Sequence, residues 1–225
     1  MSSFTDHHLT KTEYLSQRDN INPYFIEDEK VFDKKGKYLF DLVDFEKYEH
    51  LLYDRVTKCF ISTGSMFCGF LHERGIIKTI VDEVAYELAL DKVMKKGETR
   101  FHWEVHKRLF NNVILKDSDF TFEYEKATLS AIQKIMKKGD PLMISLFIKP
   151  WYPSGKGHLT LGSGYREDLN EKFIGVNLKD PFGKLLTNYR DHDGDNSFVP
   201  IADFKKAING PSKSPCHIGF LQEKK

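Results

Sequence analysis

Residues 157–184 are GHLTLGSGYREDLNEKFIGVNLKDPFGK, and two apolar runs in this stretch flank a polar segment. The runs, HLTLGSGY and KFIGVNL, are short and bounded by turn residues, which predicts two antiparallel neighbouring strands joined near 168–171. His158 stands at the start of the first strand and Asp180 at the exit of the second. Because the start of one antiparallel strand lies beside the end of the next, His158 and Asp180 are expected at the same edge of a sheet.

The rest of the C-terminal half continues this strand-rich pattern. PLMISLFI follows the turn signal Asp140-Pro141 and has the near-continuous apolar character of a buried strand. PIADFKKAING predicts a surface helix that ends at Asn209-Gly210, and CHIGFLQ predicts a closing strand.

The first 140 residues are expected to be mostly helical. Apolar residues recur at helical spacing from Ser62 until Gly75, which is typical of a buried helix with a glycine at its C-terminal end. Further helices are predicted within 79–96, near 101–111 and at 126–138, whereas residues 1–20 are expected to be irregular. A turn or hairpin around Gly36 and a short helix at about 44–55 complete this half. Helices followed by strands favour a single α+β domain built from packed layers.

Composition excludes several classes of function. The 225 residues are 40% hydrophobic, which suits one domain, and 34 Lys and Arg balance 33 Asp and Glu. This balance gives no bulk attraction to nucleic acid or to a membrane surface. The three cysteines, Cys59, Cys68 and Cys216, have no CxxC spacing, which favours reduced thiols. Without an apolar leader or an apolar run of membrane-spanning length, the expected location is cytoplasmic, or released or injected without a signal peptide.

Cys59 is the candidate nucleophile. In KCFISTGSMF, at 58–67, it stands at or just before the predicted helix start. The unpaired N–H groups of a helix N-terminus favour an anion and can lower the pKa of a thiol, although a lone cysteine there is more often inert core. Cys68 is nine residues further along the same helix and should point away from whatever Cys59 faces.

His158 is the candidate base. Gly155 and Gly157 precede it, so the backbone can turn tightly and leave the imidazole at the mouth of a strand. The alternative is a histidine that is simply satisfied at a sheet edge. Asp180 could orient the imidazole of His158. Alternatively, Asp-Pro-Phe-Gly, at 180–183, could be an ordinary turn. The two interpretations are compatible, because such a turn would fix the position of the Asp180 carboxylate.

Other patterns predict neither a metal nor a cofactor. His102 and His106 are four residues apart, but no third ligand is evident. RDHDGDN at 190–196 lacks the glycine and glutamate positions of a calcium loop and is interpreted as a solvated loop. Ser65 is not in a GxSxG elbow, which argues against a serine nucleophile.

Several segments together resemble the papain-like bacteriocin-processing peptidases and the wider group of double-glycine leader peptidase-like proteins. These segments are SQRDN at 16–20, CFISTGSM, a strand after Gly-Asp-Pro, GHLTLGSGY and VNLKDPFG. The resemblance implies a papain-like fold with Cys59 as nucleophile, His158 as general base and acid, Asp180 as the residue that orients His158, and Gln17 as a donor to the oxyanion.

The sequence departs from these relatives between the glutamine and the cysteine. The relatives usually keep the two close together, whereas about forty residues intervene here. Residues 25–57 are therefore predicted to be an insertion that covers the cleft or forms a partner surface.

The function that this resemblance implies is hydrolysis of an amide bond through an acyl-enzyme. A peptide or a cell-wall peptide is the expected substrate in a bacterial or phage context, and acyl transfer remains open. Trp151 and Tyr152 form an aromatic turn that could line the substrate cleft or pack on its own strand. The alternative function is a catalytically inactive binding or assembly module with the same fold. No nucleic-acid partner is expected, and the sequence leaves the oligomeric state open.

Overall fold

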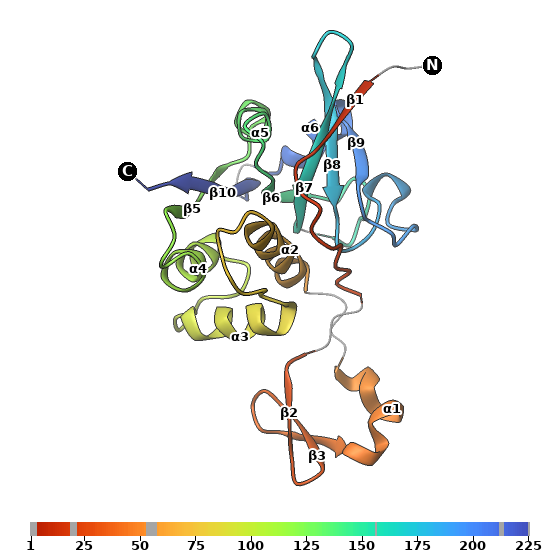
Figure 1. The fold of residues 1–225 in the computed structure, drawn as a ribbon. Helices are drawn as coiled ribbons and strands as arrows, with labels where there is room; N and C mark the ends of the chain where they lie inside the picture. The colour runs from red at the N-terminus through yellow and green to blue at the C-terminus, as the bar shows by residue number, and fades with distance from the viewer. Residues whose placement is uncertain (1–3, 19–21, 53–57, 156, 212–213, 225) are drawn as a thin grey trace.

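A computed structural model describes residues 4–18, 22–52, 58–155, 157–211 and 214–224. It contains a main body, in which helices cover a large antiparallel sheet, and a small lobe formed by residues 22–52 (Figure 1). This mixture of helices and antiparallel strands confirms the predicted α+β class.

The sheet of the main body has seven strands. Six follow the order β5-β10-β6-β7-β8-β9, and β1 pairs with the far part of β7. All of these pairings are antiparallel. The strands are β1 (Phe4–His8), β5 (Phe120–Lys126), β6 (Leu142–Phe147), β7 (Gly157–Asp168), β8 (Phe173–Lys179), β9 (Ser197–Pro200) and β10 (His217–Glu223).

Helices cover both faces of this sheet (Figure 1). One face packs on α2 (Cys59–Glu73), α3 (Glu83–Val93) and α4 (Trp103–Leu109), which runs on into a π-helical turn at Phe110–Ile114. The other face packs on α5 (Leu129–Met136) and α6 (Ile201–Ile208), and a 3-10 turn (Leu185–Thr187) follows β8.

The alternation of side chains along β6 explains the two cores. Met143 points into the core under α2, whereas Ile144 and Leu146 point into the core under α6. Residues of a strand alternate between faces, so an almost wholly apolar strand such as β6 can be buried on both sides. The helix α2 ends where the sequence predicts, because Gly75 adopts a left-handed conformation with φ +68 and donates its N–H to His72 O.

The lobe is a three-stranded sheet covered by short helices. Strands β2 (Tyr24–Glu27), β3 (Lys30–Asp33) and β4 (Tyr38–Asp41) pair in that order. The covering turns are η1 (Leu42–Asp44), α1 (Phe45–Tyr48) and η2 (Glu49–Leu52). The predicted hairpin around Gly36 and the helix after it are confirmed up to Leu52, and residues 53–57 lie outside the described residues.

Two expectations about the N-terminal half are wrong. Residues 4–8 form strand β1 rather than irregular chain, and residues 120–126 form strand β5 before the helix that was predicted from 126. With the strands of the lobe, this half is mixed rather than mostly helical. The partners of both strands are distant in sequence, since β1 pairs with β7 and β5 with β10. Local periodicity does not reveal such pairings. None of the helices in the described part of the chain combines the length and apolar composition needed to cross a bilayer.

Candidate active site

Cys59, His158 and Asp180 lie at the ends of three packed elements. Cys59 is the first residue of α2, His158 is the second residue of β7, and Asp180 directly follows β8. The imidazole Nε2 of His158 lies 2.5 Å from Oδ1 of Asp180. The predicted meeting of His158 and Asp180 at one sheet edge is therefore confirmed, and the start of α2 brings Cys59 to the same place.

The electrostatic environment raises the pKa of the His158 imidazole. Burial would lower the pKa of His158, but the Asp180 carboxylate, through charge and hydrogen bonding, and the Cys59 side chain raise it to about 10. The side chains of His158 and Asp180 are only 4% and 1% exposed, so water screens their attraction little. Because Nε2 faces Asp180, the other ring nitrogen, Nδ1, is the one available to Cys59.

Two aromatic rings enclose the His158–Asp180 pair. The rings of Phe182 and Tyr189 lie 6.0 and 5.9 Å from the imidazole, measured between centroids. The Tyr189 hydroxyl donates to Oδ2 of Asp180 at 3.4 Å, and the Phe182 N–H donates to Oδ1 at 3.0 Å. The rings exclude solvent, while these donors fix the position of the carboxylate beside the imidazole.

The backbone of Asp180 is held by the loop that precedes β9. Its N–H donates to Gly194 O at 3.0 Å, and the Tyr14 hydroxyl donates to Asp180 O at 2.9 Å. A Cβ on residue 194 would stand 1.9 Å from Asp180 O, so only glycine permits this contact. Residues 190–196 therefore support the candidate site. The sequence of this segment, charged residues around one glycine, did not indicate that it supports Asp180.

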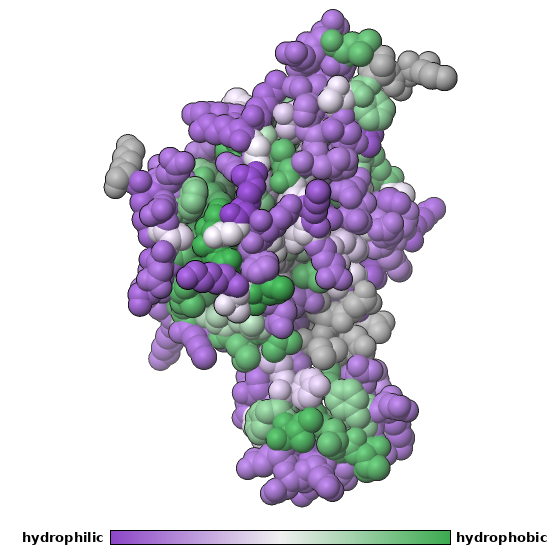
Figure 2. Space-filling model, viewed as in Figure 1, coloured by the Kyte–Doolittle hydropathy of each residue, from purple (hydrophilic) through white to green (hydrophobic). Residues whose placement is uncertain are grey.

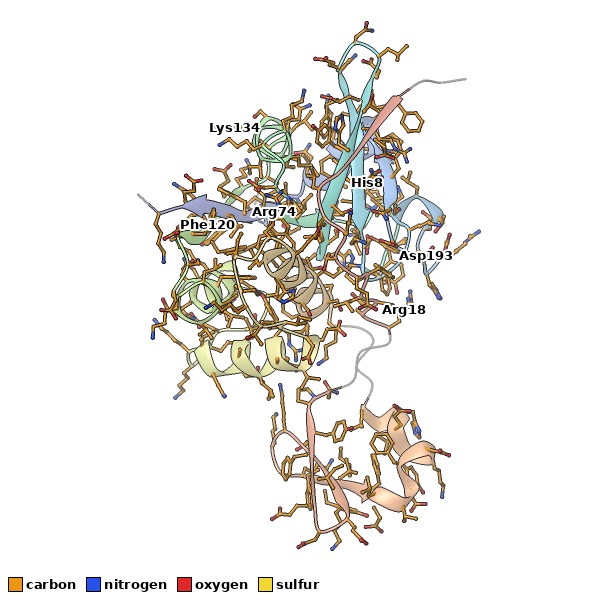
Figure 3. The ribbon with its side chains drawn as sticks, viewed as in Figure 1. His8, Arg18, Arg74, Phe120, Lys134 and Asp193 are labelled. Carbon is orange, nitrogen blue, oxygen red and sulfur yellow. The ribbon has the colours of Figure 1, made fainter. Side chains whose placement is uncertain are left out.

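Gln17 is brought to the same end of the molecule. It is 2% exposed, and its N–H donates to Pro181 O at 2.9 Å, directly beside Asp180. The neighbouring Leu15 N–H contacts Sδ of Met66 on α2 at 3.4 Å, and Arg18, which Figure 3 labels, donates from Nε to Phe182 O at 3.2 Å. Residues 15–18 thus bridge α2 and the Asp180 turn, and the oxyanion role of Gln17 stays a prediction.

A buried ion cluster lies immediately before Cys59. Lys58 is fully buried, and its ammonium group pairs with the carboxylate of Glu87 on α3, which is itself 2% exposed. Lys34 Nζ, from the turn between β3 and β4, lies 2.9 Å from the same carboxylate, and Arg100 lies 3.7 Å from it. Burial would raise the pKa of Glu87, but Lys58 and Lys34 outweigh it and lower that pKa.

An apolar groove of about 950 Å³ opens beside His158. One wall is aromatic and is formed by Phe60, Phe101 and Trp103. The ring centroids of Phe101 and Trp103 lie 5.2 and 6.4 Å from the ring centroid of Phe60. The opposite wall comes from the facing ends of β6, β7 and β10 and includes Phe147.

Trp151 and Tyr152 are not among the residues that line this groove, although Pro153 and Ser154 are. Trp151 packs on the core under α6, and Tyr152 contacts the rings of Phe182 and Tyr189 at 5.3 and 6.1 Å. Their packing matches the alternative interpretation of the aromatic turn, and a role for them at the cleft stays a prediction.

Of the remaining sequence candidates, Cys68 and His106 are buried in the core, whereas His102 is exposed. Cys68 is fully buried, and burial raises the pKa of its thiol far above the ordinary value. His106 is also fully buried, and burial lowers its pKa to about 4 while it bonds Tyr86 at 2.8 Å and Arg100 O at 2.7 Å. Within the described ranges, no group of three His, Cys, Asp or Glu side chains has the arrangement of a metal site.

A second groove, of about 1000 Å³, lies between α5 and the β5–β10 edge. Its lining includes Arg74, Phe120 and Lys134, all labelled in Figure 3, and Asp140. It is lined by none of Cys59, His158 and Asp180, whereas His158 lines the first groove, so the candidate site is assigned to the groove beside His158.

Comparison with known proteins supports the fold assignment. No family model and no curated protein matches the chain. A crystal structure from Bacillus anthracis, of a protein provisionally assigned as a C39-like peptidase, superimposes with a TM-score of 0.52 and 13% sequence identity. The match covers 98% of this chain and 100% of that one, so it includes the helices and the sheet edge that carry the candidate site. The chain therefore has the fold of a C39-like peptidase.

Proposed function

We propose that the protein is a cysteine hydrolase that cleaves a peptide bond, with Cys59 as nucleophile, His158 as general base and acid, and Asp180 as the residue that orients His158. The observation that carries this proposal is the buried imidazole of His158, bonded through Nε2 to Asp180 and acted on by Cys59. A structural histidine needs neither a thiol partner nor a position beside an open groove.

The proposed reaction starts from an ion pair of the Cys59 thiolate and the His158 imidazolium, which forms when the thiol proton passes to Nδ1 of His158. The thiolate then attacks the substrate carbonyl carbon, and negative charge develops on the carbonyl oxygen. Cys59 is the first residue of α2, so its backbone N–H has no acceptor within the helix and can donate to this oxygen, together with the side-chain amide of Gln17.

Collapse of this intermediate breaks the C–N bond, and His158 gives its proton to the leaving amine. The acyl group is then a thioester on Cys59. Water, activated by His158, attacks the thioester and releases the acid product and the free thiol. An amine that replaces this water would turn the same site into an acyltransferase.

The groove beside His158 is the proposed substrate cleft. Its aromatic wall begins next to Cys59, because Phe60, which lines the groove, is the next residue of α2. A peptide with a large apolar side chain near the scissile bond would bury that side chain against Phe60 and Phe101. Cell-wall peptides of bacteria are one class that the site could process.

The proposal predicts that replacing Cys59 by alanine abolishes hydrolysis. A mixture of synthetic peptides with apolar, polar and charged residues would be incubated with the protein, and the fragments would be identified by mass spectrometry. Cys68→Ala is the matched control, because it removes a thiol from the same helix and should leave the cleavage pattern unchanged. Cleavage that persists in Cys59→Ala would contradict the proposal, and binding without any cleavage would favour the inactive module.

We also propose that residues 22–52 are an insertion into the papain-like domain. The two ends of the lobe meet, because Asn22 N–H donates to Leu52 O at 2.6 Å, and the lobe has its own core of Val31, Phe40 and Leu52. Replacing residues 24–51 by a short Gly-Ser linker should therefore leave the main body folded. Cooperative thermal unfolding of the shortened chain is the expected result, and loss of cooperative unfolding would show that the lobe is integral to the domain.

A further inference from the structure

The outer face of the lobe sheet carries a row of three aromatic side chains. Phe25 lies opposite Phe32, and Phe32 lies opposite Tyr38, so the three side chains project from the same face of β2, β3 and β4. The rings of Phe25 and Phe32 stack at 5.3 Å, and the rings of Phe32 and Tyr38 meet edge-on at 6.0 Å. We call these three residues the aromatic row.

The aromatic row faces away from the core of the lobe. Val31 and Phe40 project from the opposite face, and they are 0% and 3% exposed. Phe25 and Tyr38, in contrast, are 42% and 47% exposed. Figure 2 shows hydrophobic residues gathered on the lobe below the main body. A small sheet that already has a core gains nothing for its own folding from an exposed row of rings, which is typical of an interaction surface.

Carboxylates adjoin the aromatic row. Glu27 lies opposite Lys30, and Lys30 lies opposite Asp41, so an acid–lysine–acid row follows the rings on the same face. The hydroxyl of Tyr38 hydrogen-bonds the Asp41 side chain, which joins the two rows. Residues 22–52 contain eight acidic and five basic residues in all.

Three of the five basic residues of the lobe lie at its other end, whereas Lys30 lies between Glu27 and Asp41 and Lys47 lies on α1. Lys34, Lys35 and Lys37 belong to the turn between β3 and β4, and Lys34 is held by Glu87 and Asp91 of α3. The end of the lobe sheet away from this turn, at Glu27–Glu29, is therefore its acidic end. Aromatic faces attract cations, and neighbouring carboxylates add to that attraction.

One edge of the lobe sheet can accept another strand. Among the described residues, β2 pairs with no strand other than β3, so the N–H and C=O groups on its other edge have no strand partner. An extended peptide can add to such an edge, and its alternate side chains then lie over the face of the sheet.

We propose that the lobe binds an extended basic polypeptide segment, which adds to β2 and places Lys or Arg side chains over the aromatic row beside Glu27 and Asp41. This surface is separate from the groove beside His158 and does not depend on hydrolysis by Cys59. Lys35 and Lys37 would repel the positive side chains of the bound segment. These side chains should therefore lie toward the acidic end of the lobe sheet, at Glu27–Glu29, and away from the turn between β3 and β4.

The test measures binding of fluorescein-labelled peptides to full-length Cys59→Ala protein by fluorescence anisotropy, so that no probe is cleaved. One peptide alternates lysine with threonine, and matched peptides replace every lysine by glutamine or by glutamate. The lysine peptide is expected to bind about tenfold more tightly than the glutamine peptide, and its affinity should fall as salt rises. The glutamate peptide should bind most weakly.

Variants locate the surface. Phe25→Ser combined with Tyr38→Ser should weaken binding of the lysine peptide about tenfold, and Glu27→Gln should weaken it less. Val43→Ser is the matched control, because Val43 is 91% exposed but belongs to η1 and not to the sheet. Thermal unfolding of each variant establishes that the lobe is still folded, and Glu27→Gln, a surface change, provides a readout if the double variant unfolds.

Three results would overturn the proposal. Equal affinity for the lysine, glutamine and glutamate peptides would remove the role of charge. Unchanged affinity in the folded Phe25 and Tyr38 variants would remove the role of the aromatic row. A dimer in sedimentation experiments that these variants dissociate, with no peptide binding, would make the face a contact between two copies of the chain.

Discussion

Replacing His158 by alanine should lower kcat for peptide hydrolysis by about a thousandfold or more. The imidazole is the group that takes the thiol proton and returns it to the leaving amine, and no other described side chain is bonded to Asp180 through a ring nitrogen. The measurement is kcat/KM on whichever peptide the native protein cleaves, for native protein and variant at one pH. Thermal unfolding is recorded alongside it, because His158 is buried and its loss leaves the Asp180 carboxylate without its cation.

Tyr189→Phe is the matched control for this variant. It keeps the ring that covers the imidazole and removes only a 3.4 Å contact to Oδ2 of Asp180. Its rate should therefore stay within about tenfold of the native rate. If His158→Ala folds and still hydrolyses the peptide at the native rate, the assignment of His158 as base is wrong.

Replacing Glu87 by glutamine should lower the free energy of unfolding by about 3 to 5 kcal/mol. The change leaves the buried ammonium of Lys58 without its carboxylate partner, and Lys58 is only 1% exposed at its side chain. Because the pKa of Glu87 is lowered in the folded protein, this stabilisation is present above its ordinary pKa and is lost as the pH falls through the lowered value. Urea unfolding monitored by tryptophan fluorescence measures the loss.

Two companion variants separate the charge from the packing. Asp91→Asn breaks the other contact of Lys34, and because the Asp91 side chain is 35% exposed it should cost less than about 1 kcal/mol. Lys58→Met combined with Glu87→Gln removes both buried charges and should recover most of the lost stability. A Glu87→Gln protein as stable as the native one would contradict the role assigned to this pair.

The hairpin of β7 and β8 could be predicted because its signals are local. Two apolar runs and the turn between them determine the pairing, and the pairing determines that His158 meets Asp180. The start of α2 close to Cys59 was predictable for the same reason, since helical periodicity runs from Ser62 to Gly75, and the helix begins at Cys59 itself.

Other parts of the site depend on contacts that no local pattern reveals. Lys58 and Glu87 are 29 positions apart, and the sequence gives no sign that both are buried. Gly194 supports Asp180 only because a loop returns to the end of β8, so its segment looked like a solvated loop. The aromatic row was not predicted either, because it needs the register of three strands and a bulge in β4 that turns Tyr38 outward.

The pairing of Cys59 with His158 is tested most directly by the pH dependence of iodoacetamide labelling at Cys59, followed by mass spectrometry in native protein and in His158→Ala. Raised to about 10 by Asp180 and Cys59, the pKa of His158 keeps the imidazole protonated at neutral pH, where it can stabilise a thiolate on Cys59. We expect fast labelling of Cys59 at neutral pH in native protein, much slower labelling in His158→Ala, and slow labelling of buried Cys68 in both. Equal and slow labelling of Cys59 and Cys68 in native protein, unaffected by loss of His158, would mean that Cys59 belongs to the core and that the chain keeps the fold without the chemistry.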